Sequence, residues 1–166
     1  MQSNGLIHKL SKEIKLLITA FVIVMSVGFY SGLLFVNETS SVSPIGIQEN
    51  YIGNENDEEA QEMKFKKSER EMLSIIHSHI LSMSMIFFLV GLLVSITSLK
   101  KSLKIFIMVE PFFSILLTFG GLYLLWKGLL WMKYIVMFSG GLMTLSFTVA
   151  ILIILKELYF KKELHN

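Results

Sequence analysis

The chain has 166 residues, of which 53% are hydrophobic, and its mean hydropathy is +0.62. The net charge of +2 does not indicate a nucleic-acid partner, because the basic residues stand in short clusters at the ends of apolar stretches. The absence of cysteine excludes disulfides, thiolate metal sites, lipoprotein anchoring and cysteine catalysis.

Four apolar stretches, each long enough to cross a bilayer as a helix, follow one another along the chain. They are Leu16–Val36, Ile75–Leu99, Ile105–Trp126 and Tyr134–Leu155. The first stretch exceeds the apolar part of a signal peptide, and no cleavage pattern of small residues follows it, so we expect it to be retained. The sequence therefore predicts an all-α fold, an integral membrane four-helix bundle that forms one domain over residues 1–166.

Basic residues predict how the bundle is oriented. One side of the membrane receives nine of them, namely Lys9, Lys12, Lys15, Lys100, Lys101, Lys104, Lys156, Lys161 and Lys162. The other side receives Lys64, Lys66, Lys67, Arg70, Lys127 and Lys133. The positive-inside rule places the first set, and with it both chain ends, in the cytoplasm. We expect a multi-pass protein of the bacterial inner membrane, in contact with the lipid bilayer, whose external loop (residues 37–72) packs over the outer mouth of the bundle.

Small and polar residues on each stretch predict which helix faces pack together, because helices associate in lipid through close approach and hydrogen bonds. The four faces comprise Gly28 and Gly32; His77, Ser84, Gly91 and Ser98; Glu110, Ser114, Thr118 and Gly121; and Gly140, Gly141, Thr144 and Thr148. We expect all four faces to point into a compact bundle.

The external loop carries nine acidic and four basic residues, a net charge of −5. Its acidic part, residues 55–62, lacks the ligand spacing of an EF-hand, so we interpret it as solvated rather than as a calcium site. Ser68 and Glu71 have the spacing of a helix-capping box. The second transmembrane helix is therefore predicted to begin near Glu69, which puts His77 at the outer membrane interface and His79 just inside it.

The stretch "GIQENYIGNE…MKFKKSEREMLSIIHSHILSMSMIFF", residues 46–88, resembles a motif of an uncharacterised family of small four-span bacterial membrane proteins. The family pattern has G-I, E-x-Y-x-G-x-E, M-x-F-x-K-S and E-x-L elements, followed by histidine-x-histidine at the start of the second span. Relatives are sometimes mislabelled as an elongation factor. The resemblance implies the four-span layout and no known activity. Proteobacterial members tend to have proline after the motif methionine, whereas here Ser84 follows Met83.

One functional hypothesis is a metal or haem site at the outer interface. Imidazole and thioether groups suit copper, and histidine is a common axial ligand of haem b. The candidate cofactor ligands are His77, His79 and Met83, with Met85 added for a metal and Met72 one turn earlier. On a regular helix His77 and His79 project about 200° apart, so a shared site needs a distorted helix or further ligands.

A second hypothesis is proton or ion translocation. Glu110 is an ionisable residue inside the third stretch, and such residues are functional candidates by default. Pro111 follows it and disfavours helical geometry at Glu110, which predicts a kink or a late helix start. Glu110 and His79 fall in opposite leaflets and cannot form one site. They could bracket a path lined by Ser114, Thr118 and Thr97.

The leading interpretation is an accessory or assembly component of a larger membrane complex, bound to other membrane subunits or to a second copy of itself. In this case the histidines would bond the loop or a partner, and Glu110 would pair with Lys104 or with a partner's basic residue. An enzyme is the weaker class, because the sequence has no G-x-S-x-G, H-E-x-x-H or phosphate-loop motif. No catalytic residue is assigned.

Overall fold

The computed structural model describes residues 5–55, 57, 60 and 62–160. Its elements, in chain order, are the short 3-10 helix η1 (Ile7–Lys9) and the α-helices α1 (Lys12–Ser40), α2 (Pro44–Ile52), α3 (Glu69–Ser95), α4 (Lys101–Trp126) and α5 (Met132–Tyr159). The described residues contain no strand, and α1, α3, α4 and α5 are long and apolar enough to cross a membrane. The prediction of an all-α fold with four spans is confirmed.

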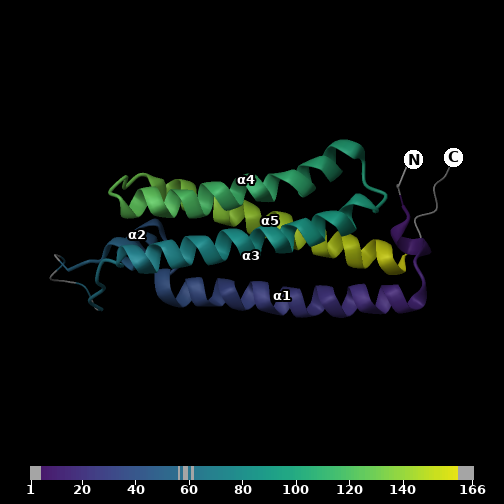
Figure 1. Ribbon diagram of the computed structural model, residues 1–166, viewed down its shortest axis with the longest axis horizontal. Helices are drawn as coiled ribbons and strands as arrows, with labels where there is room; N and C mark the ends of the chain where they lie inside the picture. The colour runs from purple at the N-terminus through teal and green to yellow at the C-terminus, as the bar shows by residue number, and fades with distance from the viewer. Residues whose placement is uncertain (1–4, 56, 58–59, 61, 161–166) are drawn as a thin grey trace.

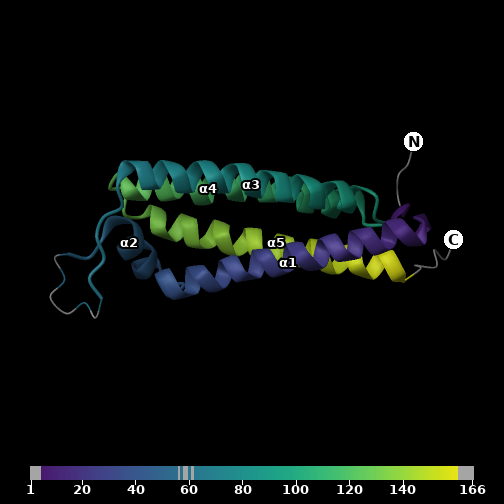
Figure 2. The ribbon, with the colours of Figure 1, turned by 60° about the horizontal axis from the view of Figure 1, so that its bottom comes forward.

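The four long helices lie roughly side by side, and η1, the start of α1 and the end of α5 are at the same end of the bundle (Figure 1). We call this the terminal end. At the opposite end, which we call the loop end, α2 packs against α1, α4 and α5 (Figure 2). Because α2 lies inside the long connection between the first two spans, that connection is a folded element. The sequence predicts only a loop here.

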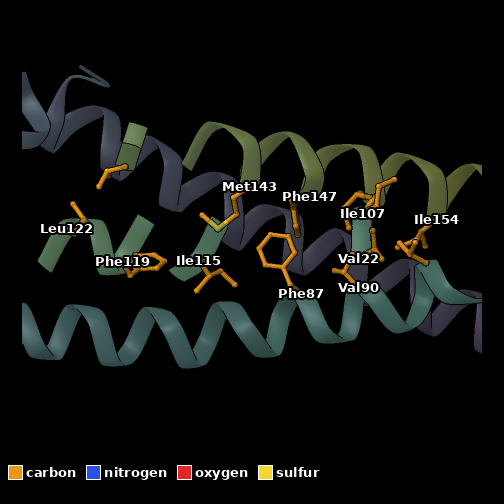
Figure 3. Close-up of a cluster of buried hydrophobic side chains, with 14 of the residues drawn as sticks. Val22, Phe87, Val90, Ile107, Ile115, Phe119, Leu122, Met143, Phe147 and Ile154 are labelled. Carbon is orange, nitrogen blue, oxygen red and sulfur yellow. The ribbon is translucent and has the colours of Figure 1, made fainter. Parts of the chain in front are cut away.

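The core is built mainly by α3, α4 and α5. Helix α4 packs along α3 on one side and along α5 on the other. Phe147 of α5 and Val94 of α3 are completely buried, and Figure 3 shows Phe147 facing Phe87 between α3 and α5. In contrast, only 6% of the apolar stretch of α1 is buried within the chain, compared with 50% for α4. Helix α1 is therefore a peripheral helix beside a three-helix core.

A few contacts attach α1 to α5. The Phe29 ring stacks on the Phe147 ring with 3.9 Å between their centroids. The Tyr30 hydroxyl lies 2.8 Å from Oγ1 of Thr148. Nearer the terminal end, Oγ1 of Thr19 lies 2.7 Å from the Tyr159 hydroxyl. Aromatic stacking and interhelical hydrogen bonds thus hold α1 along one narrow stripe.

The expected inward face of α1 is wrong. Gly28 and Gly32 are exposed, and among the described residues no packing neighbour comes within 4 Å of where a Cβ would lie at either position. The reason is that α1 uses the stripe of Ile18, Val22 and Phe29 to reach the core, and the two glycines lie beside that stripe. The expected face of α4 is confirmed, because Glu110, Ser114, Thr118 and Gly121 are all buried.

Helix ends agree only partly with the sequence. The capping box that starts α3 is present: Oγ of Ser68 accepts from the Glu71 N–H, and the Glu71 side chain accepts from the Ser68 N–H. The expected end of that span at Leu99 is wrong, because α3 ends at Ser95. Nζ of Lys104 donates to the Ser95 carbonyl at 3.0 Å and the Thr97 carbonyl at 2.7 Å, so α4 itself terminates α3.

Helix α4 is continuous from Lys101 to Trp126, with Pro111 inside it. Of the two alternatives, the late helix start is therefore wrong, and the kink stays a prediction. Proline removes one main-chain donor from a helix interior, and neighbouring helices and hydroxyl side chains make this tolerable within a membrane. Hydroxyls lie close by in this protein, around Glu110.

Candidate functional site

A buried carboxyl joins α4 to α5. Glu110 is 9% exposed, and its two oxygens accept hydrogen bonds from Oγ of Ser114 on its own helix and Oγ of Ser146 on α5. Ser114 and Ser146 are themselves buried. A buried polar group away from water is costly unless hydrogen-bonded, so these donors make Glu110 tolerable inside the bundle.

The polar contact continues one turn along α4. Oγ1 of Thr118 lies 2.7 Å from Oγ of Ser139, and both residues are buried. Glu110, Ser114 and Thr118 are four residues apart, whereas Ser139 and Ser146 are seven apart, so both rows face the same seam. We call this set of five residues the α4–α5 polar seam.

The terminal end contains a second cluster. Besides the two carbonyls that Lys104 binds, the Glu157 carboxylate accepts from the Ser98 N–H at 2.5 Å and from Oγ of Ser98 at 2.7 Å. The main-chain N–H of Gly5 also donates to the Thr97 carbonyl at 3.2 Å. These contacts fasten the α3–α4 turn to α5 and to the start of the chain.

Lys104 was expected to pair with Glu110 if the protein is an accessory subunit. In the structure the donors to Glu110 are the two serine hydroxyls, and Lys104 caps α3. Pairing of Glu110 with a partner's basic residue stays a prediction.

At the loop end, two glycines allow close approach of the main chain. A Cβ on Gly46 would lie 1.9 Å from the Ser40 carbonyl oxygen, so only glycine fits where α2 turns back onto the end of α1. Gly53 has φ = +90°, and a Cβ there would lie 2.7 Å from the main-chain nitrogen of Lys66. Both glycines belong to the G-I and E-x-Y-x-G-x-E elements of the sequence motif.

Polar contacts complete this folded element, which we call the cap (residues 44–67). The Asn54 side chain accepts from the Lys64 N–H at 2.6 Å, and the Glu55 carboxylate accepts from the Lys66 N–H at 3.2 Å. Nζ of Lys133 on α5 donates to the Gln48 side chain at 2.8 Å. The cap is thus bonded both to itself and to the core helices.

Several residues of the acidic segment 55–62, namely 56, 58, 59 and 61, lie outside the described residues. The expectation that this segment is solvated rather than a calcium site stays a prediction.

Trp126 links the cap to α4. Its Nε1 donates to the Lys67 carbonyl at 2.8 Å, and only 8% of the residue is exposed. Nζ of Lys66 lies 5.1 Å from the centre of the indole, and Nζ of Lys127 lies 4.6 Å from it. The Lys67 amine in turn lies 5.8 Å from the Tyr51 ring. Burial raises the pKa of Tyr51, so the phenol is neutral at physiological pH.

Trp126→Phe keeps the apolar ring and removes the N–H donor, so the Lys67 carbonyl loses its partner. We expect the free energy of unfolding to fall by about 1 kcal/mol. Trp131→Phe is the matched control, because Trp131 is 56% exposed and should tolerate the change. Detergent-induced unfolding followed by circular dichroism measures both variants. Equal stability of the two variants would show that the indole bond does not hold the cap.

The histidines do not converge. His77 and His79 are both exposed, and α3 is a regular helix through both positions, so they project about 200° apart. The His79 ring lies 5.0 Å from the Phe119 ring, and its Nδ1 lies 2.8 Å from the Ile75 carbonyl oxygen, which leaves Nε2 as the accessible ring nitrogen.

The candidate thioether ligands also differ in environment. Met72 is completely buried, Met83 is half-buried against the core and Met85 is 60% exposed. Among the residues that the structure describes, no three His, Cys, Asp or Glu side chains gather around a common metal position. Met83 is one turn from His79 and shares its face, whereas His77 does not. The copper and haem hypotheses stay predictions and need ligands beyond this pair.

Sequence reasoning identified Glu110, Ser114 and Thr118, but not their partners. The buried polar residues of α5 are Ser139 and Ser146, whereas Gly141, on the face expected to be buried, is exposed. The seven-residue spacing of the two serines was the available signal. It was overlooked in favour of the neighbouring glycine pair. The aromatic and basic cluster on Trp126 was also missed, since its members are distant in sequence.

Four apolar helices long enough to cross a bilayer, with polar side chains paired inside the bundle, define a multi-pass membrane protein in contact with lipid. Residues 41–165 match the model of a family described as a transmembrane helical domain, and the chain belongs to this family. The match covers α2, α3, α4 and α5 and starts where α1 has just ended. No curated protein and no solved structure matches the chain.

Proposed function

We propose that this protein is an accessory or assembly component of a larger membrane complex, and that α1 binds a transmembrane helix of its partner. The observation that carries the proposal is the exposure of α1, of whose apolar stretch only 6% is buried within the chain. A helix that contributes so little to its own core is available to pack against another chain.

The surface of α1 has features that favour a helix as its partner. Gly28 and Gly32 lie one turn apart and expose main chain, which lets a second helix approach closely and pack by van der Waals contact. On the other side of α1, a groove of about 540 Å³ runs between Val22, Val27 and Leu34 of this helix and Leu155 of α5. Both sides of α1 therefore offer shaped surface that this chain does not fill.

The polar seam supports a structural role for the core. Both oxygens of Glu110 are bonded by hydroxyls from the same chain, and each donor is buried. Thr118 and Ser139 pair in the same way. Interhelical hydrogen bonds of this kind hold α4 against α5, and they leave α1 as the helix with unused packing surface.

We place the protein in the bacterial inner membrane with its terminal end in the cytoplasm. Lysines are more numerous in the segments at the terminal end, and short basic segments are retained on the cytoplasmic side. The cap, with its net negative charge, would then be external. Cysteine labelling with a membrane-impermeant reagent at Gln48→Cys and at Lys101→Cys tests this. With the proposed orientation, intact cells should be labelled at Gln48→Cys and not at Lys101→Cys. The opposite labelling pattern would show that the terminal end is external.

The partner is tested by affinity purification from native membranes in a mild detergent. Wild type is expected to bring down one or more membrane proteins in fixed ratio. Gly32→Ile should lower their recovery about tenfold, because a branched side chain prevents the close approach of two helices. The free energy of unfolding of the isolated chain should not fall, since nothing lies within 4 Å of that position.

Gly141→Ile is the matched control, because Gly141 is also exposed with open space beside it but lies on α5. It should leave partner recovery unchanged. A wild-type sample that remains a lone chain under these conditions would contradict the proposal. Recovery of a second copy alone, abolished by Gly32→Ile, would mean that α1 serves a homodimer.

Glu110 favours a second candidate function, proton or ion handling. A carboxyl held by two hydroxyls inside a membrane bundle can exchange a proton with them. The hydroxyl pair of Thr118 and Ser139 lies one helical turn beyond Ser114 and would extend the path. This function requires that proteoliposomes conduct protons or cations and that Glu110→Gln abolishes the flux. Wild-type liposomes as tight as protein-free ones would exclude it.

A further inference from the structure

Two basic side chains share one aromatic ring at the loop end. Nζ of Lys66, in the cap, and Nζ of Lys127, just after α4, lie 5.1 and 4.6 Å from the centre of the Trp126 indole. The Lys127 amine also lies 5.4 Å from the Tyr123 ring. The two ammonium groups therefore lie within about 10 Å of each other, and an anion that binds between them is attracted to both.

The platform beneath the two amines is fixed. Trp126 is almost completely buried, and its N–H is bonded to the Lys67 carbonyl at the end of the cap. The ring therefore attracts both Lys66 and Lys127 through cation–π interaction, although they come from segments about 60 residues apart. Attraction to a fixed ring lowers the rotational freedom that the two lysine side chains lose when a ligand binds.

The described residues neutralise the pair incompletely. Among them, the carboxylate that pairs with Lys127 is that of Glu69, with 3.6 Å between Nζ and Oε1, and the two side chains are 49% and 62% exposed. An exposed pair at this distance is weak. Among the described residues no carboxylate lies within ion-pair distance of Nζ of Lys66. The Glu55 carboxylate, which is nearby in the cap, instead accepts from the main-chain N–H of Lys66.

The position of Trp126 along the bundle indicates which kind of anion would bind beside it. Trp126 is the last residue of α4, and tryptophan and tyrosine at the ends of transmembrane helices lie at the level of the lipid headgroups. Just beside it, Leu124, Leu129 and Leu130 are exposed apolar residues. A ligand with a phosphate for the two amines and a hydrocarbon tail for these leucines matches both surfaces.

We propose that Lys66 and Lys127, held on Trp126, form a binding site for the phosphate of an anionic phospholipid in the leaflet at the loop end. The lipid bridges the cap and the end of α4. It therefore stabilises the folded cap. The site is separate from the α1 surface of the proposed function and does not depend on it.

The test uses the full-length protein in nanodiscs made of phosphatidylcholine with or without phosphatidylglycerol, followed by native mass spectrometry of the retained lipid. Wild type should retain phosphatidylglycerol in preference to phosphatidylcholine. Lys66→Gln/Lys127→Gln should lower this retention roughly tenfold, because each basic residue near a charged headgroup contributes to binding. Lys66→Arg/Lys127→Arg should keep it, since arginine binds phosphate as well.

Lys100→Gln/Lys101→Gln is the matched control, because it removes the same charge from exposed positions at the terminal end. It should retain as much phosphatidylglycerol as wild type. Equal losses in both glutamine variants would mean that net charge alone attracts the lipid and would overturn the proposal. Displacement of the lipid by millimolar inorganic phosphate in detergent would also overturn it, because the site would then bind free anions rather than a headgroup.

Discussion

Gly46→Ala is expected to detach the cap from the bundle. A methyl group at this position would lie 1.9 Å from the Ser40 carbonyl oxygen and 2.7 Å from its carbon, and both are main-chain atoms that cannot rotate away. The end of α1 and the start of α2 would have to separate, which breaks the Ser43 cap of α2 as well. We expect a cost of about 2–4 kcal/mol, concentrated in the cap.

Hydrogen exchange measured by mass spectrometry should find faster exchange in residues 44–67 of Gly46→Ala, with α4 and α5 nearly unchanged. Limited proteolysis should cut the same segment sooner. Gly120→Ala is the control, because nothing lies within 4 Å of its Cβ and alanine favours a helix by up to about 1 kcal/mol. If the cap of Gly46→Ala exchanges hydrogen as slowly as the cap of the wild type, α1 and α2 are not held in this close approach.

The double variant Ser114→Ala/Ser146→Ala is expected to have the second largest effect. It removes both hydrogen-bond donors from the Glu110 side chain, and the residue is only 9% exposed. The two substitutions remove only two oxygen atoms, so they leave little room for water to replace the lost donors. Leaving a buried polar group without its hydrogen-bond partners costs about 1–3 kcal/mol, although interhelical hydrogen bonds in membranes average about 0.6 kcal/mol. We expect a loss of about 3 kcal/mol in the free energy of unfolding.

Removing Glu110 as well tests whether the stability is lost because this buried carboxyl has no hydrogen-bond donors. Adding Glu110→Leu to the double variant should restore much of the lost stability, because the buried polar group that lacks partners is then gone. Thr144→Ala is the control: the Thr144 hydroxyl donates to the Gly140 carbonyl of its own helix, so its loss should change the free energy of unfolding by no more than about 0.5 kcal/mol. Unfolding in mixed detergent micelles measures all of these. A triple variant no more stable than the double would locate the loss elsewhere.

Part of the site could be anticipated from local pattern alone. The capping box at Ser68 and Glu71 depends on residues three positions apart, and the row of Glu110, Ser114 and Thr118 depends on the helical repeat. Helix α2 also had local signals, Ser43 as N-cap with Pro44 at the first helical position. They were overlooked because nine residues are too few to produce a clear apolar period.

The interaction partners of these residues could not be predicted from the sequence. Ser146 is 36 residues from Glu110, and Lys66 is 60 residues from Trp126, so no local spacing relates them. The outward direction of Gly28 and Gly32 was likewise hidden. A glycine pair that packs inside one chain and a pair that faces lipid or a partner look the same in sequence.

The sequence by itself determined that this is a four-span, all-α membrane protein. The length and hydropathy of each stretch are sufficient for that, because main-chain polar groups in lipid must be satisfied within the helix. Only the tertiary structure decided that α1 is peripheral, that α5 supplies the partner of Glu110 and that the cap rests on Trp126. The physical reason is that lipid and protein interior are equally apolar. Hydrophobicity therefore fixes which segments enter the membrane, whereas close packing and hydrogen bonds between distant residues fix how they are arranged.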